Sequence, residues 1–324
     1  MMKRVLITGG TGFVGTNLAR RLVHDGHAVH LLVRPGYKPW RIEAIRANVR
    51  LHELHLHDLS EVTRVVSKIR PEWVFHLAAH GAYSWQTDLN QMVLTNITGT
   101  MNLVRACLHT GFEAFVNTGS SSEYGYKDQA PPETELLEPN SHYAVTKASA
   151  TLFCQYTAQQ EKVHLPTLRL YAVYGPYEEP SRLIPTLIIR ALQGDLPPLV
   201  SPATARDFIY VDDVVEAYLM AASHPGKELG AVYNVGTGVQ TTIREVVEIA
   251  SHLLVITAKP HWGTMPDRIW DTAVWVADNR KIGKQIGWSP RFRFADGLAS
   301  TLQWFQDNPD LLRLYESRSF QSVI

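Results

Sequence analysis

Tyr143 and Lys147 have the side chains in this 324-residue chain whose types and spacing most clearly suggest chemistry. Residues i and i+4 of a helix share one face, so this phenol and this ammonium can contact the same small molecule. A positive charge beside a phenol lowers its pKa from about 10 toward the neutral range. The pair could therefore carry a proton to or from an alcohol or a ketone. The same spacing is also common on solvated helix faces, so a functional role for this pair depends on the elements around it.

The stretch from Gly9 to Gly15 has the glycine spacing of a phosphate-binding turn. The β-branched, apolar run before it, Arg4 to Thr8, is typical of a buried strand, and apolar residues at helical spacing follow it up to Gly26. Between a strand and a helix, such glycines allow a tight turn and a close approach of the backbone to a pyrophosphate, which the helix N-terminus attracts. We therefore predict a dinucleotide cofactor on this turn. The residues predicted to contact it are Gly9, Thr11, Gly12, Phe13, Val14 and Gly15.

Strands and helices alternate through the first half of the chain. The predicted strands cover residues 4–8, 28–33, 49–54, 73–78, 114–118 and 165–170, and the predicted helices include 60–69, 88–109 and 141–161. This alternation indicates an α/β fold with a doubly wound parallel sheet.

A series of prolines interrupts this alternation from Pro176 onward. We therefore expect a nucleotide-binding domain over residues 1–172, to which residues 207–223 return, and a smaller substrate-binding domain, mainly over residues 173–315. Residues 316–324 lack clear periodicity and are expected to form a disordered tail.

The residue after the second predicted strand bears on the choice of cofactor. Folds that prefer NAD usually place an acidic residue there, on the ribose 2′-hydroxyl. This chain has Val33 followed by Arg34, whose guanidinium could pair with a 2′-phosphate. We therefore expect NADP(H), with NAD(H) as the alternative if Arg34 is only a solvated loop residue. Asp58 and Leu59 could lie at the adenine edge, although Asp58 could equally cap the helix that follows it.

Charge and cysteine content limit the partners and the compartment. Lys plus Arg and Asp plus Glu number 31 each, so the net charge attracts neither nucleic acid nor an anionic membrane. The two cysteines, Cys107 and Cys154, lie in apolar helix-like segments and suggest buried thiols of a reducing compartment, with no disulfide and no metal site. A strand follows the N-terminus almost at once, and no apolar run reaches about 18 residues. We therefore expect a soluble cytoplasmic protein.

Eight stretches of the chain together resemble one protein family. They are Thr8 to Gly15, His76 to Ala79, Asn96, Thr118 to Gly125, Tyr143 to Lys147, Val173 to Pro176, Arg206 to Asp213 and Tyr233 to Gly238, in this order. The series is similar to the extended short-chain dehydrogenase/reductases, the group of NAD(P)-dependent nucleotide-sugar epimerases, dehydratases and reductases, over nearly the whole chain. The resemblance implies a Rossmann-type nucleotide-binding domain, a nucleotide-diphosphate sugar as substrate, and a homodimer paired through helices around 90–109 and 141–161.

The resemblance also implies roles for individual residues. Tyr143 would be the general acid/base, Lys147 would hold the nicotinamide ribose and lower the tyrosine pKa, and Ser120 would bind the sugar oxygen that is oxidised or reduced. Arg206 would bind the diphosphate of the substrate. The further cofactor contacts would be Leu77, Ala78, Ala79 and Asn96, and the further substrate contacts would be Ser121, Ser122 and Arg268.

Simpler interpretations of several of these residues stay open. Ser120 could be a strand-end turn residue, His76 a packed strand histidine and Arg206 a strand-edge charge. Asp212 and Asp213 fit helix capping better than catalysis. The sugar pocket departs from the family pattern, because Ala172 and Trp270 stand where many relatives have an Asn and a phosphate-binding Arg.

Ser121 and Ser122 also differ from the family members that dehydrate hexoses, which carry an acidic pair directly after the catalytic Ser or Thr. Serines cannot do that acid/base work at neutral pH, and Glu123 lies one position too late. The run Gly119 to Gly125 instead resembles reductases of nucleotide-linked 4-keto-6-deoxy sugars. We therefore expect NADPH-dependent reduction at the sugar C4. The alternatives are a 4-epimerase with tightly bound NAD and a transient 4-keto sugar, and a non-catalytic dinucleotide-binding protein.

Overall fold

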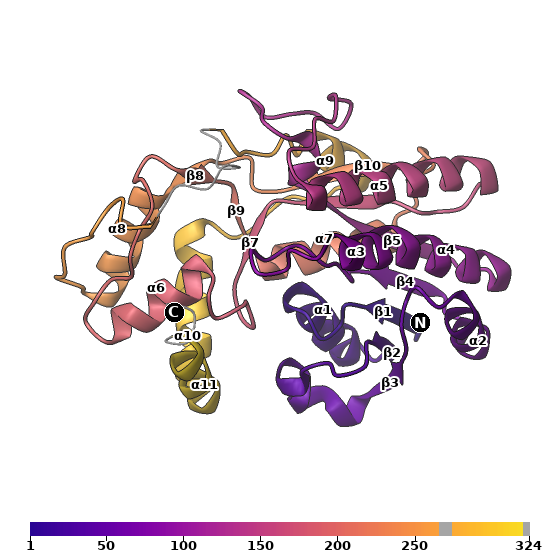
Figure 1. Ribbon diagram of the computed structural model, residues 1–324, viewed down its shortest axis with the longest axis horizontal. Helices are drawn as coiled ribbons and strands as arrows, with labels where there is room; N and C mark the ends of the chain where they lie inside the picture. Colours follow the sequence, from indigo (N-terminus) through magenta and orange to yellow (C-terminus); the bar gives the residue numbers. More distant parts are fainter. Residues whose placement is uncertain (266–273, 320–324) are drawn as a thin grey trace.

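A seven-stranded parallel sheet forms the centre of the computed structural model, which describes residues 1–265 and 274–319 (Figure 1). The strand order is β10-β6-β5-β4-β1-β2-β3, so the order reverses between β1 and β4. The strands are β1 (Arg4–Thr8), β2 (Ala28–Val33), β3 (Val49–Glu53), β4 (Trp73–His76), β5 (Ala114–Ser120), β6 (Thr167–Leu170) and β10 (Val232–Val235).

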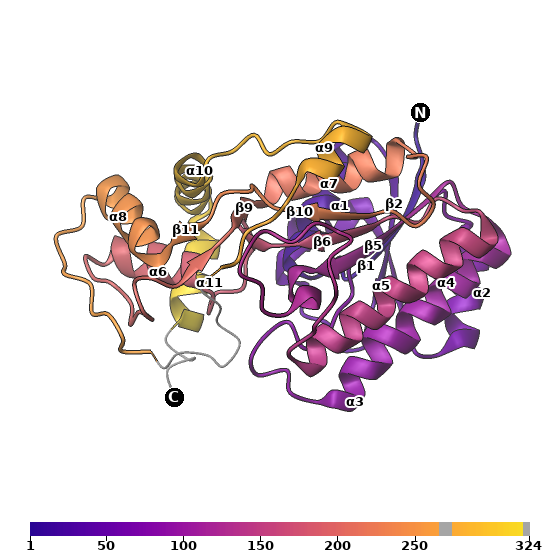
Figure 2. The same ribbon diagram turned by 90° about the horizontal axis from the view of Figure 1, so that it is seen from above.

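Helices cover both faces of this sheet (Figure 2). One face carries α1 (Phe13–His24), α7 (Val211–Ser223) and α9 (Arg280–Ile286), and the other carries α2 (Leu59–Ile69), α4 (Gly99–Thr110) and α5 (His142–Glu161). Successive residues of a strand point to opposite faces, and accordingly Val5 and Ile7 belong to the first core while Leu6 belongs to the second. All three are fully buried, and the predicted doubly wound α/β fold is confirmed.

A smaller layer lies beside the sheet, as Figure 1 shows. It contains the helices α6 (Leu183–Leu192), α8 (Ile243–Leu254), α10 (Phe294–Asp307) and α11 (Pro309–Ser319), and the paired short strands β7 (Ala172–Tyr174) with β9 (Phe208–Tyr210) and β8 (Ala205–Arg206) with β11 (Thr241–Thr242). Leu187, Val246, Leu298, Phe305 and Tyr315 are among the residues of its separate hydrophobic core.

Several elements differ from the sequence-based expectation. The strand β10 was not predicted; it has four residues and pairs with β6. The predicted helix over 88–109 is divided into α3 (Leu89–Met92), a π-helical turn η3 (Val93–Thr98) and α4. The expected tail from residue 316 is helical as far as Ser319, because α11 packs through the fully buried Tyr315, and residues 320–324 lie outside the described chain. Among the described residues, no helix has the length and apolar character needed to span a bilayer.

Candidate active site

The glycine turn lies at the carboxyl end of β1, where the strand order of the sheet reverses. Gly9 has a φ of +70°, and its carbonyl accepts the Gly12 N–H at 2.9 Å. A Cβ atom on Gly15 would lie 2.2 Å from the Gly9 carbonyl oxygen, so the turn and α1 pack too closely for any side chain there. No side chain caps α1. Its first N–H groups are therefore suited to a pyrophosphate, and the turn fits a dinucleotide at the switch point of the sheet.

The residues after β4 are fixed to β1 beside this turn. The Leu77 N–H donates to the Thr8 carbonyl at 3.1 Å, and the Ala78 N–H donates to Thr8 Oγ1 at 3.2 Å. His76 is buried, with Nδ1 at 2.6 Å from Thr8 Oγ1 and Nε2 at 2.8 Å from Thr100 Oγ1. Burial, with a smaller effect of Lys147, lowers the pKa of His76 to about 3, so it is a neutral packing residue that shapes the turn to Ala79.

The residues expected near the adenine end sit at the ends of their elements. Arg34 is exposed directly after β2. Asp58 is the N-cap of α2, which begins at Leu59: its carboxylate accepts the Glu61 N–H at 3.0 Å and the Ser60 hydroxyl at 2.8 Å. The backbone hydrogen bond from Glu61 is the main cause of a lowered Asp58 pKa. The capping function of Asp58 is therefore visible in the structure itself.

Asn96 lies fully buried in the π-helical turn and has protein partners for its side chain. Its Oδ1 accepts the His80 N–H at 2.8 Å, and its Nδ2 donates to the His80 carbonyl at 2.8 Å and to Thr146 Oγ1 at 2.9 Å. Asn96 thus ties the loop after β4 to α5, one residue before Lys147. We expected a cofactor contact here, and the hydrogen bonds of the side chain show that it holds the loop after β4 in place.

Ser120, Tyr143 and Lys147 come together where β5 ends and α5 begins. The Ser120 side chain lies close enough to the Tyr143 hydroxyl to lower its pKa, and Ser120 Oγ lies 2.8 Å from Ser122 Oγ. Ser141 caps α5 by accepting the Ala144 N–H, which fixes the first turn that carries Tyr143. Lys147, one turn later and 3% exposed, donates to the Thr118 carbonyl. The three predicted catalytic side chains therefore converge from two elements.

The expected lowering of the Tyr143 pKa by Lys147 is not found. Burial raises the pKa of Tyr143 to about 12, and the hydrogen bond with Ser120 offsets this only in part. Burial likewise lowers the pKa of Lys147, whose ammonium is engaged by Thr118. In this structure the tyrosine is a neutral phenol, the form that donates a proton.

Glu123 occupies a buried network below Ser120, in the short helix η4 (Ser121–Tyr124). Its Oε1 accepts the Ser120 N–H at 2.8 Å and the Thr151 hydroxyl at 3.0 Å, and its Oε2 accepts Arg169 Nε at 2.8 Å. The Arg169 guanidinium also donates to the Tyr124 hydroxyl at 2.8 Å. Because both carboxylate oxygens are used, Glu123 positions Ser120 and is not placed to act as a dehydration acid.

One of the predicted substrate contacts, Ser121, borders a small cavity of about 10 Å³. Ser121 lines it together with Tyr171 and Trp275, which the sequence analysis did not single out. Ser122 contacts Ser120 directly, and the guanidinium carbon of Arg206 lies 5.3 Å from the centre of the Trp275 ring. Arg268, and Trp270 which replaces an expected arginine, fall outside the described residues. An aromatic residue just after a sheet strand was the only sequence signal for Tyr171.

Asp213 does not cap its own helix. Its carboxylate accepts the backbone N–H groups of Arg291 at 3.0 Å and Phe292 at 3.0 Å, so it anchors the segment before α10 to the start of α7. The N-cap of α7 is Tyr210, whose side chain makes no capping hydrogen bond to the helix. The expectation of helix capping by Asp213 is therefore corrected to a tertiary contact.

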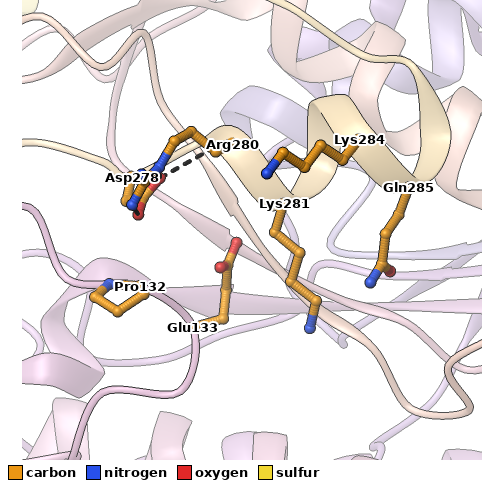
Figure 3. A pocket seen from close by; sticks show the side chains of 7 residues that line it. All are labelled: Pro132, Glu133, Asp278, Arg280, Lys281, Lys284 and Gln285. Atoms are coloured by element: carbon orange, nitrogen blue, oxygen red, sulfur yellow. Dashed lines mark hydrogen bonds and ion pairs between the residues drawn. The ribbon is translucent and has the colours of Figure 1, made fainter.

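A larger cavity of about 370 Å³ lies on the other side of β10, between α9 and the loop at Pro132 (Figure 3). Of its lining residues, Arg280 pairs with Asp278 at 2.6 Å, and Lys281 pairs at 2.8 Å with Glu228, which does not line the cavity. None of the three converging residues lines it. The described chain also contains no group of three or more His, Cys, Asp or Glu side chains that could hold a metal ion.

Comparison with known proteins adds independent information. A family model described as the NAD dependent epimerase/dehydratase family matches residues 5–236. The UDP-glucose 4-epimerase of Mycolicibacterium smegmatis is 28% identical over 315 residues, covering 94% of this chain and 99% of that protein. The dTDP-glucose 4,6-dehydratase of Streptomyces griseus is 29% identical over 318 residues, covering 94% of this chain and 94% of that protein.

Solved structures give the same result. A UDP-glucose 4-epimerase of Thermotoga maritima, in complex with UDP-glucose, superposes with a TM-score of 0.85 at 27% identity, covering 94% of this chain and 99% of that one. MoeE5 in complex with UDP-glucuronic acid and NAD superposes with a TM-score of 0.81 at 30% identity and the same coverage.

Proposed function

The chain belongs to the NAD dependent epimerase/dehydratase family, as its motifs indicated, and on this premise we propose that it is a nucleotide-sugar 4-epimerase with retained NAD(H). One observation carries the proposal: Ser120 at the end of β5 lies close enough to the Tyr143 phenol to lower its pKa, while Ser121 and Ser122 occupy the positions of the dehydratase acids. Such a site can move a hydride and a proton at one carbinol carbon and lacks the further acid and base for dehydration. The relatives named UDP-glucose 4-epimerase support this choice.

Each of these residues has its own role in the proposed reaction. Ser120 and Tyr143 hold the O4 hydroxyl of the hexose, and ionised Tyr143 takes its proton as the C4–H leaves as hydride. After the 4-keto sugar has turned its other face, the hydride returns to C4 on that face and the same phenol returns the proton to O4. Lys147, between the Thr118 carbonyl and the cofactor side, holds the ribose. Oxidised nicotinamide, when bound, accepts the hydride and supplies the positive charge that lowers the Tyr143 pKa.

The cofactor proposed is NAD(H), held by the glycine turn and the residues after β4. The earlier expectation of NADP(H) from Arg34 has no support among the relatives, because the MoeE5 complex contains NAD. Arg34 is nonetheless exposed at the end of β2, where it can stack on adenine. Titration of wild type and Arg34→Ala with NADH and NADPH tests this assignment. If the substitution lowers the affinity for NADPH alone, NADP(H) is the cofactor that Arg34 selects.

A second candidate is the reduction of a nucleotide-linked 4-keto-6-deoxy sugar with an external nicotinamide cofactor. The specific observation in its favour is the raised Tyr143 pKa, which keeps the phenol protonated and ready to donate to a keto oxygen. Turnover separates the two functions. An epimerase interconverts UDP-glucose and UDP-galactose with no net absorbance change at about 340 nm, whereas a reductase consumes reduced cofactor in proportion to product.

The experiment starts with mass spectrometry of ligands that copurify with the protein, followed by assays with UDP-, dTDP- and GDP-hexoses. Tyr143→Phe should lower turnover by at least about a hundredfold, because the proton carrier is lost, and should leave cofactor affinity unchanged. Tyr156→Phe on the exposed side of the same helix is the matched control and should keep full turnover. Full activity of Tyr143→Phe would contradict the mechanism.

A further inference from the structure

Tyr171 has a buried hydroxyl with no hydrogen-bond partner among the described residues. The residue is 8% exposed. Other buried tyrosine hydroxyls are bonded: that of Tyr124 to Asn234 at 2.7 Å and that of Tyr233 to Gln285 at 2.8 Å. Buried hydroxyls normally find a partner, so the exception at Tyr171 points to a ligand that supplies one.

The position of Tyr171 places this hydroxyl beside the reacting groups. Ser120 and Leu170 are register partners at the ends of the parallel strands β5 and β6, so Ser121 and Tyr171 leave the sheet side by side. Both residues line the same small cavity, and Trp275 contributes to its wall. Ser121 adjoins Ser120 in the chain, and the Arg206 guanidinium carbon lies 5.3 Å from the centre of the Trp275 ring, so the wall of the cavity includes a neighbour of each of these two groups.

We propose that Tyr171 is a specificity-determining residue that donates a hydrogen bond to a hydroxyl group of the hexose, on a carbon other than the one that reacts. The inference rests on the proposed function, which places the reacting oxygen at Ser120 and the diphosphate at Arg206. The space beside Tyr171 is about 10 Å³, which is room for a single oxygen atom and not for a sugar ring. A ring hydroxyl of a hexose bound between these two ends would enter this space and accept the hydrogen bond of the phenol.

The charges around the cavity select a neutral substituent over a carboxylate. Among the described residues, Lys127 is the only basic residue that lines it, and its ammonium is already paired with Glu138 and lies 3.8 Å from Glu135. The carboxylates of Asp207 and Glu133 raise the pKa of Tyr171, and the guanidinium of Arg169 lowers it. Burial, the largest effect, raises the Tyr171 pKa well above its ordinary value, so the phenol stays a donor.

The test compares wild type with Tyr171→Phe, which removes one oxygen and keeps the ring. Both are assayed with UDP-glucose, with its 2-, 3- and 6-deoxy analogues, and with UDP-glucuronate. We expect wild type to use one deoxy analogue and UDP-glucuronate at least roughly tenfold less well than UDP-glucose, in kcat/KM. In Tyr171→Phe, UDP-glucose should fall roughly tenfold, mainly through KM, while that deoxy analogue stays unchanged.

Thermal unfolding provides a readout that does not depend on turnover. Because the Tyr171 hydroxyl has no partner, Tyr171→Phe without ligand should melt at the wild-type temperature or above it. Tyr233→Phe is the matched control, since its hydroxyl is bonded to Gln285 away from the site; it should melt lower and keep wild-type kinetics. Equal selectivity of wild type and Tyr171→Phe would overturn the inference while leaving the proposed function intact. Absence of turnover by wild type with every nucleotide hexose would overturn both.

Discussion

Glu123 and Arg169 form a buried ion pair on which the geometry of Ser120 depends. The two side chains are 0% and 2% exposed, and their closest contact is 2.8 Å. Two charges out of water are tolerated only when every hydrogen-bonding atom is satisfied, and here Ser120, Thr151 and Tyr124 complete the network. The network thereby fixes the backbone of Ser120 at the end of β5.

Glu123→Gln should lower the free energy of unfolding by about 3 to 5 kcal/mol, because it leaves the Arg169 charge buried without its partner. Urea unfolding followed by circular dichroism measures the change. The double variant Glu123→Gln with Arg169→Met should recover part of the loss, since the unpaired charge is then absent. A loss below about 1 kcal/mol for the single variant would show that the pair does not stabilise the fold.

Glu178 is a second buried carboxylate, in the segment between β7 and α6. It is 5% exposed, its Oε2 has no hydrogen-bond partner among the described residues, and Arg182 Nε lies 3.7 Å from Oε1. Burial raises its pKa from about 4.5 to about 8, against the smaller opposing effects of Arg182 and Arg41. Between these two pH values the folded chain keeps a proton that the unfolded chain has released, so stability falls as the pH rises through this window.

Glu178→Gln should therefore flatten the dependence of stability on pH between about 5 and 8 and should raise the urea midpoint above that of wild type at about pH 8. Glu179→Gln is the neighbouring control; this partly exposed carboxylate pairs with Arg41 at 2.9 Å, and its variant should keep the wild-type slope. Parallel slopes for wild type and Glu178→Gln would mean that Glu178 is ionised in the folded protein.

Among the elements, β1 and α1 are joined by a turn whose backbone packs too closely to leave room for side chains at Gly9 and Gly15. A Cβ on Gly9 would meet the Leu77 backbone at 2.6 Å, and one on Gly15 would meet the Gly9 carbonyl at 2.2 Å. The turn therefore sets the distance of α1 from both β1 and β4. This close packing brings the N-terminus of α1 to the place where the pyrophosphate is expected.

Gly15→Ala should weaken NAD binding by at least about tenfold and lower stability by about 1 to 3 kcal/mol, because α1 has to move away from the turn. Calorimetric titration with NAD and thermal unfolding measure the two effects. Gly283→Ala in α9 is the control: its Cβ would have 3.4 Å to the Trp288 carbonyl, so binding and stability should be retained. Tight NAD binding by Gly15→Ala would contradict the proposed cofactor position.

At the scale of the whole molecule, two adjacent helical segments leave an apolar face uncovered. Leu89, Val93 and Met101 on α3, η3 and α4 are 37% to 44% exposed, and Leu152 and Tyr156 on α5 are 56% and 64% exposed. Each set follows helical spacing along one side, and α4 and α5 lie side by side (Figure 2). We propose that a second copy covers this face, pairing the same helices around a two-fold axis, as the motif resemblance implied.

Leu152→Glu should convert a dimer to a monomer, because it places a charge in the centre of the proposed contact. Size-exclusion chromatography with light scattering measures the mass. Leu136→Glu serves as the control, since Leu136 is 70% exposed on the loop before α5, and it should leave the mass unchanged. A wild-type protein of monomeric mass at micromolar concentration would refute the proposed dimer.

Features that depend on consecutive or helically spaced residues could be predicted from the amino-acid sequence. The glycine turn, the order of strands and helices, and the Tyr143–Lys147 pair could be predicted because each signal lies within a few residues of the chain. Ser120 and the serines after it were predicted from a similarly short run. The strand β10 was missed, because a four-residue strand gains its place only by pairing with β6.

The hydrogen-bond partners and the protonation of those residues depend on the tertiary structure. Glu123 and its partner Arg169 are 46 residues apart in the sequence, and Asn96 and its partner Thr146 are 50 residues apart. The sheet and the helix packed on it bring each pair together. Tyr171 meets Ser121 through the pairing of β5 with β6, which no local pattern reveals. The Tyr143 pKa had the wrong predicted direction for the same reason. Spacing places Lys147 on the face of Tyr143, but the protonation of a phenol follows its burial and all the charges around it, which exist only in the folded chain.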